Sequence, residues 1–497
     1  MKKLTMMVVL ALGTLSTAQA ATTYEISKEW TFTHSGSGYL SEIPAFDAAT
    51  NTLWVAGVKG VDVLDATTGN FLQRIDTSAY GNINSVSISN GMAAFAIENT
   101  ARTNAGIVQL YNTSTRSLAS GTNSFTVGAL PDMVTFTPDG KKILVANEGT
   151  PDVYGKRVGA TVPRVYGPAA NDPVGSVTII DVTSRTVAAT ATLAGVPTSG
   201  SHIRTNTGMD FEPEYIAVSA DGSKAYVTLQ EANAIGILDL NTHAFTQVVG
   251  LGVKDFSQPG NSIDPLNNGS VNFINPNVKG LYMPDGIAAY DVKGQTYLVM
   301  ANEGDFREDD GDRSNASSLG VTGDLANIRV SNTDSSASDL YAAGGRSFSI
   351  RDADGNLVYD SGDILDKEAF ARGIYDDARS RDKGVEPEGV DLFTLGGRTL
   401  AAVGLERTLK GAIALFDITD PTKVSFIDMI VSDGDLAPEG LVAFEKNGAI
   451  YLAFANEGSN TTSLFKVSAV PEPGSAAMLG LGLVAMAALR RRQQSSL

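Results

Sequence analysis

Acidic residues recur at two positions of a segment that this 497-residue chain repeats. In one copy Asp132 directly follows a proline, and Glu148 is the third residue of an Ala-Asn-Glu-Gly run. The residues at the first position are Asp132, Glu214, Asp285, Glu388 and Glu439, and those at the second are Glu98, Glu148, Glu231, Glu303, Glu406 and Glu457. Hard cations prefer carboxylate oxygens as ligands, so a cluster of these residues predicts a site for Ca²⁺ first and Mg²⁺ second.

Each repeat also predicts the element that would bring its two acidic positions together. A short apolar run, a turn that contains glycine and a second apolar run are typical of a β-hairpin. The first acidic position begins the first strand and the second ends the second strand, as at Asp132 and Glu148. Because the hairpin turn lies at the opposite end, we expect both sets of carboxylates on one face.

Two further apolar runs follow most of these hairpins, for example residues 177–181 and 186–193. Four antiparallel strands, repeated radially, form the blades of a β-propeller. Seven copies therefore predict an all-β fold, a single seven-bladed β-propeller over residues 21–470. The seventh copy has no fourth run, so we expect the N-terminal strand at residues 24–33 to complete the last sheet beside residues 463–467.

Long insertions are expected on the same face as the carboxylates, because they join second to third strands or one blade to the next. They cover residues 150–175, 195–212, 252–283, 305–346 and 361–386. Loops of more than about 12 to 15 residues are commonly functional. His202 and Arg204 in one insertion, and Arg407 beside Glu406, are candidates for binding an anionic substrate. The alternative is that the acidic residues satisfy backbone amides at turns and the basic ones form solvated ion pairs.

Composition argues against several other activities. The formal charge of −18 disfavours a nucleic-acid partner. The sequence has three histidines and no cysteine, and it lacks a Gly-x-Ser-x-Gly elbow and a phosphate-binding glycine loop. Residues needed for catalytic triads, zinc–histidine sites and nucleotide hydrolysis are therefore missing.

The two ends of the sequence predict export. Residues 1–20 have a charged start, an apolar run and a small-residue exit, which is the pattern of a cleaved signal peptide. Residues 471–497 combine Pro471-Glu472-Pro473, an apolar stretch at 476–489 and three arginines. We expect contact with the membrane only through this C-terminal segment, and a final location in the cell envelope or outside the cell with both ends removed. A permanent C-terminal anchor is the alternative.

Two family resemblances follow from these motifs. Residues 471–497 resemble the PEP-CTERM sorting signal, which implies processing by an exosortase-type enzyme. The Pro-acid strands, the Ala-Asn-Glu-Gly runs and residues 346–356 resemble the choice-of-anchor I family over about 30–467. That resemblance implies an extracellular, propeller-like domain, and some members are labelled alkaline phosphatase by similarity. The repeats are also distantly similar to phytase-like propellers, in which clustered carboxylates bind calcium.

Two functional hypotheses result. The first is a surface or matrix propeller without catalysis that binds a cation or a ligand, such as an exopolysaccharide or a surface protein, through its acidic face. The second is a calcium-dependent phosphoesterase, of alkaline phosphatase or phytase type, that uses a metal-activated water. The first is favoured because few basic or histidine side chains are available to hold phosphate.

Overall fold

The computed structural model describes residues 23–151, 172–204, 211–306 and 312–470. The chain divides into two compact units. Residues 27–466 form the larger one, and the smaller one is described only at 23–26 and 467–470. The all-β prediction is confirmed: strands dominate the described chain, and α1 (Ile364–Ala371) is its one α-helix.

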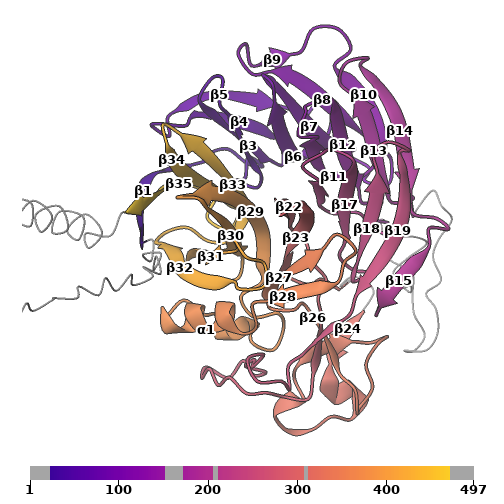
Figure 1. Ribbon diagram of the computed structural model, residues 1–497, viewed down its shortest axis with the longest axis vertical. Coiled ribbons are helices and arrows are strands. Elements are labelled where there is room, and N and C mark those ends of the chain that lie inside the picture. Colours follow the sequence, from indigo (N-terminus) through magenta and orange to yellow (C-terminus); the bar gives the residue numbers. More distant parts are fainter. Residues whose placement is uncertain (1–22, 152–171, 205–210, 307–311, 471–497) are drawn as a thin grey trace, which may run out of the picture. The chain divides into compact units, whose positions relative to one another are not determined.

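Seven sheets of four or five strands follow one another along the described chain (Figure 1). The first three contain β2 (Pro44–Asp47), β3 (Thr52–Gly57), β4 (Gly60–Asp65) and β5 (Phe71–Asp76); β6 (Asn82–Ser89), β7 (Met92–Glu98), β8 (Ala105–Asn112) and β10 (Ser124–Ala129), with β9 (Ser117–Leu118) beside β8; and β11 (Pro131–Phe136), β12 (Lys142–Asn147), β13 (Ser176–Asp181) and β14 (Thr186–Thr192). The fourth contains β16 (Ile216–Val218), β17 (Lys224–Leu229), β18 (Ala234–Asp239), β19 (Ala244–Leu251) and the parallel strand β15 (Thr198–Ser201).

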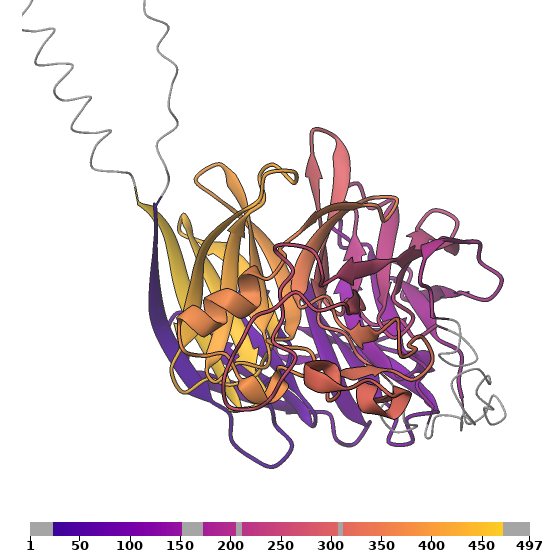
Figure 2. The same cartoon turned by 90° about the horizontal axis from the view of Figure 1, so that it is seen from below.

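The fifth and sixth sheets contain β22 (Ile287–Val292), β23 (Gln295–Asn302), β27 (Ser347–Asp352) and β28 (Leu357–Asp360); and β29 (Pro387–Leu395), β30 (Arg398–Leu405), β31 (Gly411–Asp417) and β32 (Ser425–Ser432). The last contains β33 (Pro438–Lys446), β34 (Ala449–Asn456), β35 (Thr461–Val470) and β1 (Thr23–Thr33). Figures 1 and 2 both show the indigo strand β1 beside the yellow strand β35, which is the predicted pairing.

The first strands of the seven sheets contact one another in a cycle. Contacts run from β2 to β6, β11, β16, β22, β29 and β33, and β33 contacts β2 again. The apolar core lies between neighbouring sheets. Trp54 and Val63 of the first sheet pack with Phe95 of the second, and Leu53 packs with Leu464 of the last. Burial of each such side chain stabilises the fold by about 1.5 to 3 kcal/mol.

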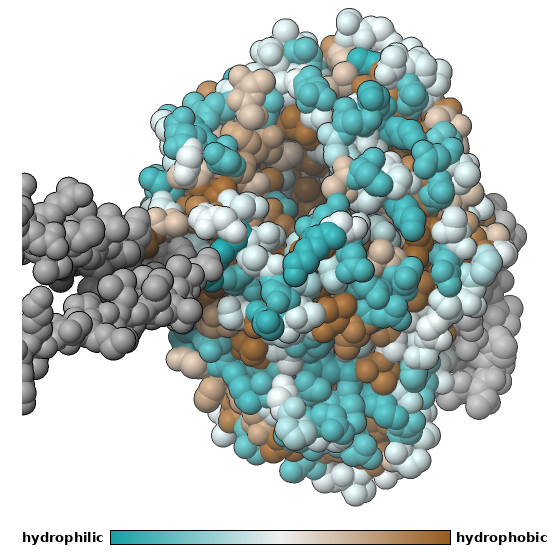
Figure 3. Space-filling view, viewed as in Figure 1, coloured by the Kyte–Doolittle hydropathy of each residue, from teal (hydrophilic) through white to brown (hydrophobic). Residues whose placement is uncertain are grey.

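Smaller elements come from the insertions. They are β20 (Val253–Asp255), β21 (Lys279–Leu281) and β26 (Tyr341–Ala343), which form one small sheet, the pair β24 (Arg313–Asn315) and β25 (Arg329–Ser331), and the 3₁₀ turns η2 (Ala316–Leu319), η3 (Gly323–Leu325) and η4 (Asp377–Arg379). Hydrophilic residues predominate on the face of the molecule seen in Figure 3, and its hydrophobic patches are small and scattered.

Candidate metal centre

The residue before the proline near the start of several first strands has a strained backbone, and we call this position the corner of its repeat. Leu130, Met283, Glu386 and Ala437 have φ between 44° and 53°, and each precedes a proline. A residue other than glycine rarely adopts a positive φ, and a residue before proline is usually extended. The strain is compensated by hydrogen bonding, since the carbonyl of Leu130 accepts the N–H of Glu148 at 2.9 Å. Each corner therefore fixes the two acidic positions of its repeat against each other.

The same corner recurs in other sheets. The carbonyl of Ala437 accepts the N–H of Glu457 at 2.8 Å, and that of Glu386 accepts the N–H of Glu406 at 2.9 Å. The pairing register also shifts directly after the proline in these sheets. Such a bulge re-aims the side chain that follows it. Backbone geometry thus turns the acidic residue after proline out of the regular ladder.

The asparagine of the Ala-Asn-Glu-Gly run is a structural residue. Asn147, Asn302 and Asn456 are fully buried. Their Nδ2 atoms donate to the carbonyl of the facing third strand, at Ser176 (3.2 Å), Ser347 (2.9 Å) and Thr461 (3.1 Å) respectively. The asparagine therefore ties the second strand to the third, and the glutamates beside Asn302 and Asn456 line a cavity.

These corners surround a cavity of about 650 Å³. Its acidic lining comprises Glu42, Asp132, Glu214, Asp285, Glu303, Asp305, Glu386, Glu388, Glu406, Glu439 and Glu457. The predicted ligands are therefore all among the lining residues except Glu98, Glu148 and Glu231, and the last two lie next to the lining residue Glu214. Glu98 has a separate partner, because its Oε1 accepts a hydrogen bond from Asn82 at 2.8 Å.

Three carboxylates meet at one side of this cavity. One oxygen from each of Glu148, Glu214 and Glu231 lies within 4.8 Å of the other two. We call this set the first trio. Glu231 is 6% exposed, and its Oε2 is buried with no hydrogen-bond partner. Glu148 accepts a hydrogen bond from the hydroxyl of Thr150. Among the residues that the structure describes, none forms an ion pair with these three carboxylates.

Burial and mutual repulsion act on the acids of the cavity. Burial, followed by the charges of Asp132 and Glu231, raises the pKa of Glu148 to about 8. Burial and then the charge of Glu148 raise the pKa of Glu214 as well. Burial also raises the pKa of Asp132 to about 6, with a further contribution from Glu98. At Glu148 the hydrogen bond from Thr150 and the charge of Arg102 act in the opposite direction but are outweighed, and a bound cation would favour the ionised forms further.

Two other trios include residues of sheets six and seven. Glu303, Glu386 and Glu406 form the second trio, and Glu406, Glu439 and Glu457 form the third, both by the same 4.8 Å criterion. The second trio already has a basic partner. Lys383 Nζ lies 2.5 Å from Glu303 Oε1 and 3.0 Å from Glu386 Oε2. Although burial opposes it, the charges of these two glutamates raise the pKa of Lys383.

Four basic residues line the cavity: Arg313, Arg379, Lys383 and Arg407. Sequence reasoning identified only Arg407 among them. Arg407 Nη2 lies 2.6 Å from Glu406 Oε1, and Arg379 Nη2 lies 2.5 Å from Glu386 Oε1. Arg379 and Lys383 belong to the predicted insertion 361–386, whose basic run ends three residues before the Glu-Pro-Glu repeat start at Glu386. That run is the signal in the sequence that could have revealed them.

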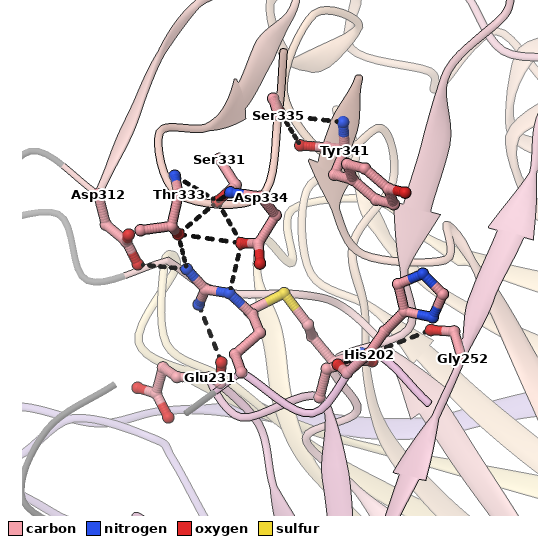
Figure 4. A network of polar contacts seen from close by, with 12 residues as sticks. His202, Glu231, Gly252, Asp312, Ser331, Thr333, Asp334, Ser335 and Tyr341 are labelled. Carbon is pink, nitrogen blue, oxygen red and sulfur yellow. Dashed lines mark hydrogen bonds and ion pairs between the residues drawn. The ribbon is translucent and has the colours of Figure 1, made fainter. Parts of the chain in front are cut away.

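Arg204 lies in a network outside the cavity lining (Figure 4). Its guanidinium donates to Asp312 at 2.8 Å, to Asp334 at 3.0 Å and to the carbonyl of Glu231 at 2.9 Å. The side chain is buried and stacks over Phe306. These contacts favour a positioning role toward Glu231 over the predicted contact with substrate.

His202 occupies a different environment from Arg204. It is exposed, and its ring lies 5.8 Å from that of Tyr341 (Figure 4). It is absent from the cavity lining, as is Arg204. The cavity therefore brings together Arg407 and the carboxylates, and it does not bring His202 to them.

The fold and the sorting motif define an exported, all-β surface protein. The sequence matches the choice-of-anchor I domain over residues 42–421, and the chain belongs to this family. Residues 469–492 match the PEP-CTERM protein-sorting motif, which implies processing by an exosortase. The described part of the chain includes no helix of sufficient length and apolarity to cross a membrane, and the predicted apolar segment at 476–489 lies outside the described residues.

Comparison with other proteins adds information on fold alone. No curated protein matches the sequence. Among solved structures, the chain is similar to hydrazine synthase of Kuenenia stuttgartiensis, with a TM-score of 0.50 and 10% identity. The likeness covers 87% of this chain and 96% of the other. At this identity it is a likeness of fold.

Proposed function

We propose that residues 21–470 form a seven-bladed β-propeller, and that its acidic cavity binds a divalent cation, with calcium as the first choice. The propeller interpretation is supported by the order of the seven sheets and by the cycle of contacts among their first strands. Radially repeated four-stranded sheets are the architecture of this fold.

The observation that carries the cation proposal is the first trio. Glu148, Glu214 and Glu231 place three oxygens within 4.8 Å of one another, and Glu231 Oε2 is buried without a partner. A buried carboxylate without compensation is costly, whereas the same oxygens around a cation are favourable. Neighbouring Asp132 adds negative charge, as its effect on the pKa of Glu148 indicates.

Calcium fits this donor set better than the transition metals. The trio offers only carboxylate oxygens, and calcium accepts six to eight oxygen ligands in flexible geometry. Magnesium requires near-octahedral geometry and retains several waters, so it is the second choice. At the cell surface, a calcium-loaded face would offer open coordination positions to an anionic exopolysaccharide or to an acidic surface protein.

Calorimetric titration of chelator-treated protein with calcium tests the proposal. We expect one calcium ion per chain with a Kd on the order of micromolar. Glu231→Gln should abolish this binding, and Glu445→Gln, which changes an exposed residue of β33, should leave it intact. A wild-type protein that takes up no calcium would refute the cation proposal.

A calcium-dependent phosphoesterase is the second candidate, because Arg313, Arg379, Lys383 and Arg407 line the same cavity as the carboxylates. A bound cation would supply an activated water, and the arginines would hold the phosphate. Arg379 and Arg407 are already paired with Glu386 and Glu406, which weakens this reading. Assays with a panel of phosphomonoesters and phosphodiesters, with and without calcium, decide between the candidates.

A further inference from the structure

The second trio differs from the first in its basic partners: Arg379 and Arg407 pair with it from its more exposed side, and the buried ammonium of Lys383 lies between two of its carboxylates. One oxygen from each of Glu303, Glu386 and Glu406 lies within 4.8 Å of the other two, as in the first trio. Lys383 Nζ contacts Glu303 at 2.5 Å and Glu386 at 3.0 Å, and the residue is 7% exposed. The set therefore has the donors of a cation site and a single buried positive charge between two of them.

The ammonium is held in place by the segment that carries it. Arg346 is buried, and its Nη2 donates to the carbonyls of Ser380 at 2.6 Å and Asp382 at 3.0 Å. These bonds fix the backbone on both sides of residue 381, directly before Lys383. Arg379 bonds Glu386 from the same segment. The backbone next to Lys383 is therefore held by hydrogen bonds from Arg346, and it positions the ammonium between the two glutamates.

We propose that Lys383 is a tethered cation that fills a second divalent-cation site formed by Glu303, Glu386 and Glu406. In the native chain the cavity accordingly takes a metal ion at the first trio and an internal ammonium at the second. The inference concerns the same cavity as the proposed calcium site, and it depends on a different set of carboxylates. Removal of the lysine charge opens the second site to calcium.

The test is the number of calcium ions bound by the folded protein, measured by calorimetry and by native mass spectrometry. Lys383→Met and Lys383→Gln each remove the charge and should raise the count by one. Lys383→Arg retains the charge and should leave it unchanged. Lys410→Met is the matched control, because its ammonium pairs with Asp433, whose side chain is 83% exposed.

The double variant Lys383→Met with Glu231→Gln separates this inference from the proposed function. If the first trio binds calcium and the inference holds, wild type binds one ion, Lys383→Met two and the double variant one. If wild type and Glu231→Gln bind none and Lys383→Met binds one, the first-trio proposal fails and this inference stands.

Two results would overturn the inference. One is an unchanged count in folded Lys383→Met and Lys383→Gln. The other is a failure of both variants to fold even in the presence of calcium, because a divalent cation should replace the missing ammonium. Lys383 variants that fold only with calcium would support the inference. In that case, adding Glu303→Gln to the Lys383 variant should remove either the need for calcium or the additional bound ion.

Discussion

Gln230 and Glu303 join the two sides of the acidic cavity. Gln230 Nε2 donates to Glu303 Oε2 at 2.9 Å, while the other oxygen of Glu303 accepts the ammonium of Lys383. Gln230 stands directly before Glu231 of the first trio, where other repeats have a structural asparagine. A substitution of Lys383 can therefore shift Glu231 of the first trio, because Lys383 contacts Glu303, Glu303 accepts from Gln230, and Gln230 precedes Glu231 in the chain.

Removal of one charge from the first trio should stabilise the protein that lacks calcium. Glu231→Gln relieves repulsion among three carboxylates, two of them buried, so its melting temperature in chelator should exceed that of wild type. A millimolar ligand at a micromolar site contributes about 4 kcal/mol, and this calcium stabilisation should disappear in the variant. Differential scanning calorimetry measures both effects. Glu445→Gln is the control, and a wild-type melt that ignores chelator would contradict the prediction.

Stability without calcium should fall as the pH rises. Burial raises the pKa of Glu42, Glu148 and Glu406 to about 8, with further contributions from neighbouring acids. These groups hold more protons in the folded chain than in the unfolded chain, so their contribution is complete below pH about 4.5 and is lost as the pH rises through about 8. Calcium should reduce the part of this decline that comes from Glu148, because it takes the place of the proton there. Thermal melts at pH 5, 7 and 8.5, with calcium or chelator, test it; a rising apo profile would count against the prediction.

Loss of the Arg204 guanidinium should destabilise the protein. In Arg204→Met the carboxylate of Asp312, whose side chain is 1% exposed, loses its charge-assisted hydrogen bond from Arg204, which should cost about 1.5 to 3 kcal/mol. Arg204→Lys should not restore stability, because one ammonium cannot replace a planar group that donates to Asp312, Thr333, Asp334 and the carbonyl of Glu231. Urea unfolding provides the measurement. The half-buried Arg185, replaced by Met, is the control, and equal stability of the two variants would show that the network does not stabilise the fold.

His34 should stabilise the pairing of the first and last strands. The ring is buried and joins Asp62 at 2.9 Å to Thr462 at 2.8 Å. His34→Ala should cost about 1 to 3 kcal/mol of unfolding free energy, because it removes two buried side-chain hydrogen bonds. The matched control is His243→Asn, since His243 has φ near 58°, which asparagine tolerates. Chemical denaturation of both variants decides the outcome.

The sorting motif should control the mature C-terminus. Replacement of Pro471, Glu472 and Pro473 by alanine should block exosortase processing and leave the apolar segment on the protein. Mass spectrometry of the C-terminal peptide from the exported protein tests this, with Gln493 and Gln494 replaced by alanine as the control. Normal processing of the Pro-Glu-Pro variant would contradict it.

The strand order and the position of most acidic residues could be predicted, because both depend on local repeats. A single β-hairpin places Asp132 and Glu148 at the same end of the sheet, so the pattern of apolar runs and turns in one repeat is sufficient to predict that they are close. The unusual φ of the residue before each proline was not predictable, since local preference opposes it and the hydrogen bond to the following strand compensates.

The basic residues of the cavity could not be predicted in the same way. Lys383 lies in an insertion with no counterpart in other repeats, and its place depends on long-range bonds from Arg346 to Ser380 and Asp382. Arg204 was predicted to meet substrate because it lies in a long loop. The acidic partners that enclose it, Asp312 and Asp334, are distant in sequence.

The split of roles between Asn147 and Glu148 has a consequence for how such a protein can diversify. Asparagine secures the sheet, so the adjacent glutamate can be exchanged without loss of the strand connection. In each such repeat the charge at the glutamate position can then change by substitution, and the total charge of the cavity is the sum over the repeats. In the fourth sheet the exchange falls on the other position, because Gln230 stands where Asn147, Asn302 and Asn456 stand in their repeats, and Glu231 is retained. An architecture of this kind can acquire new ligand preferences one residue at a time, while its folding is preserved.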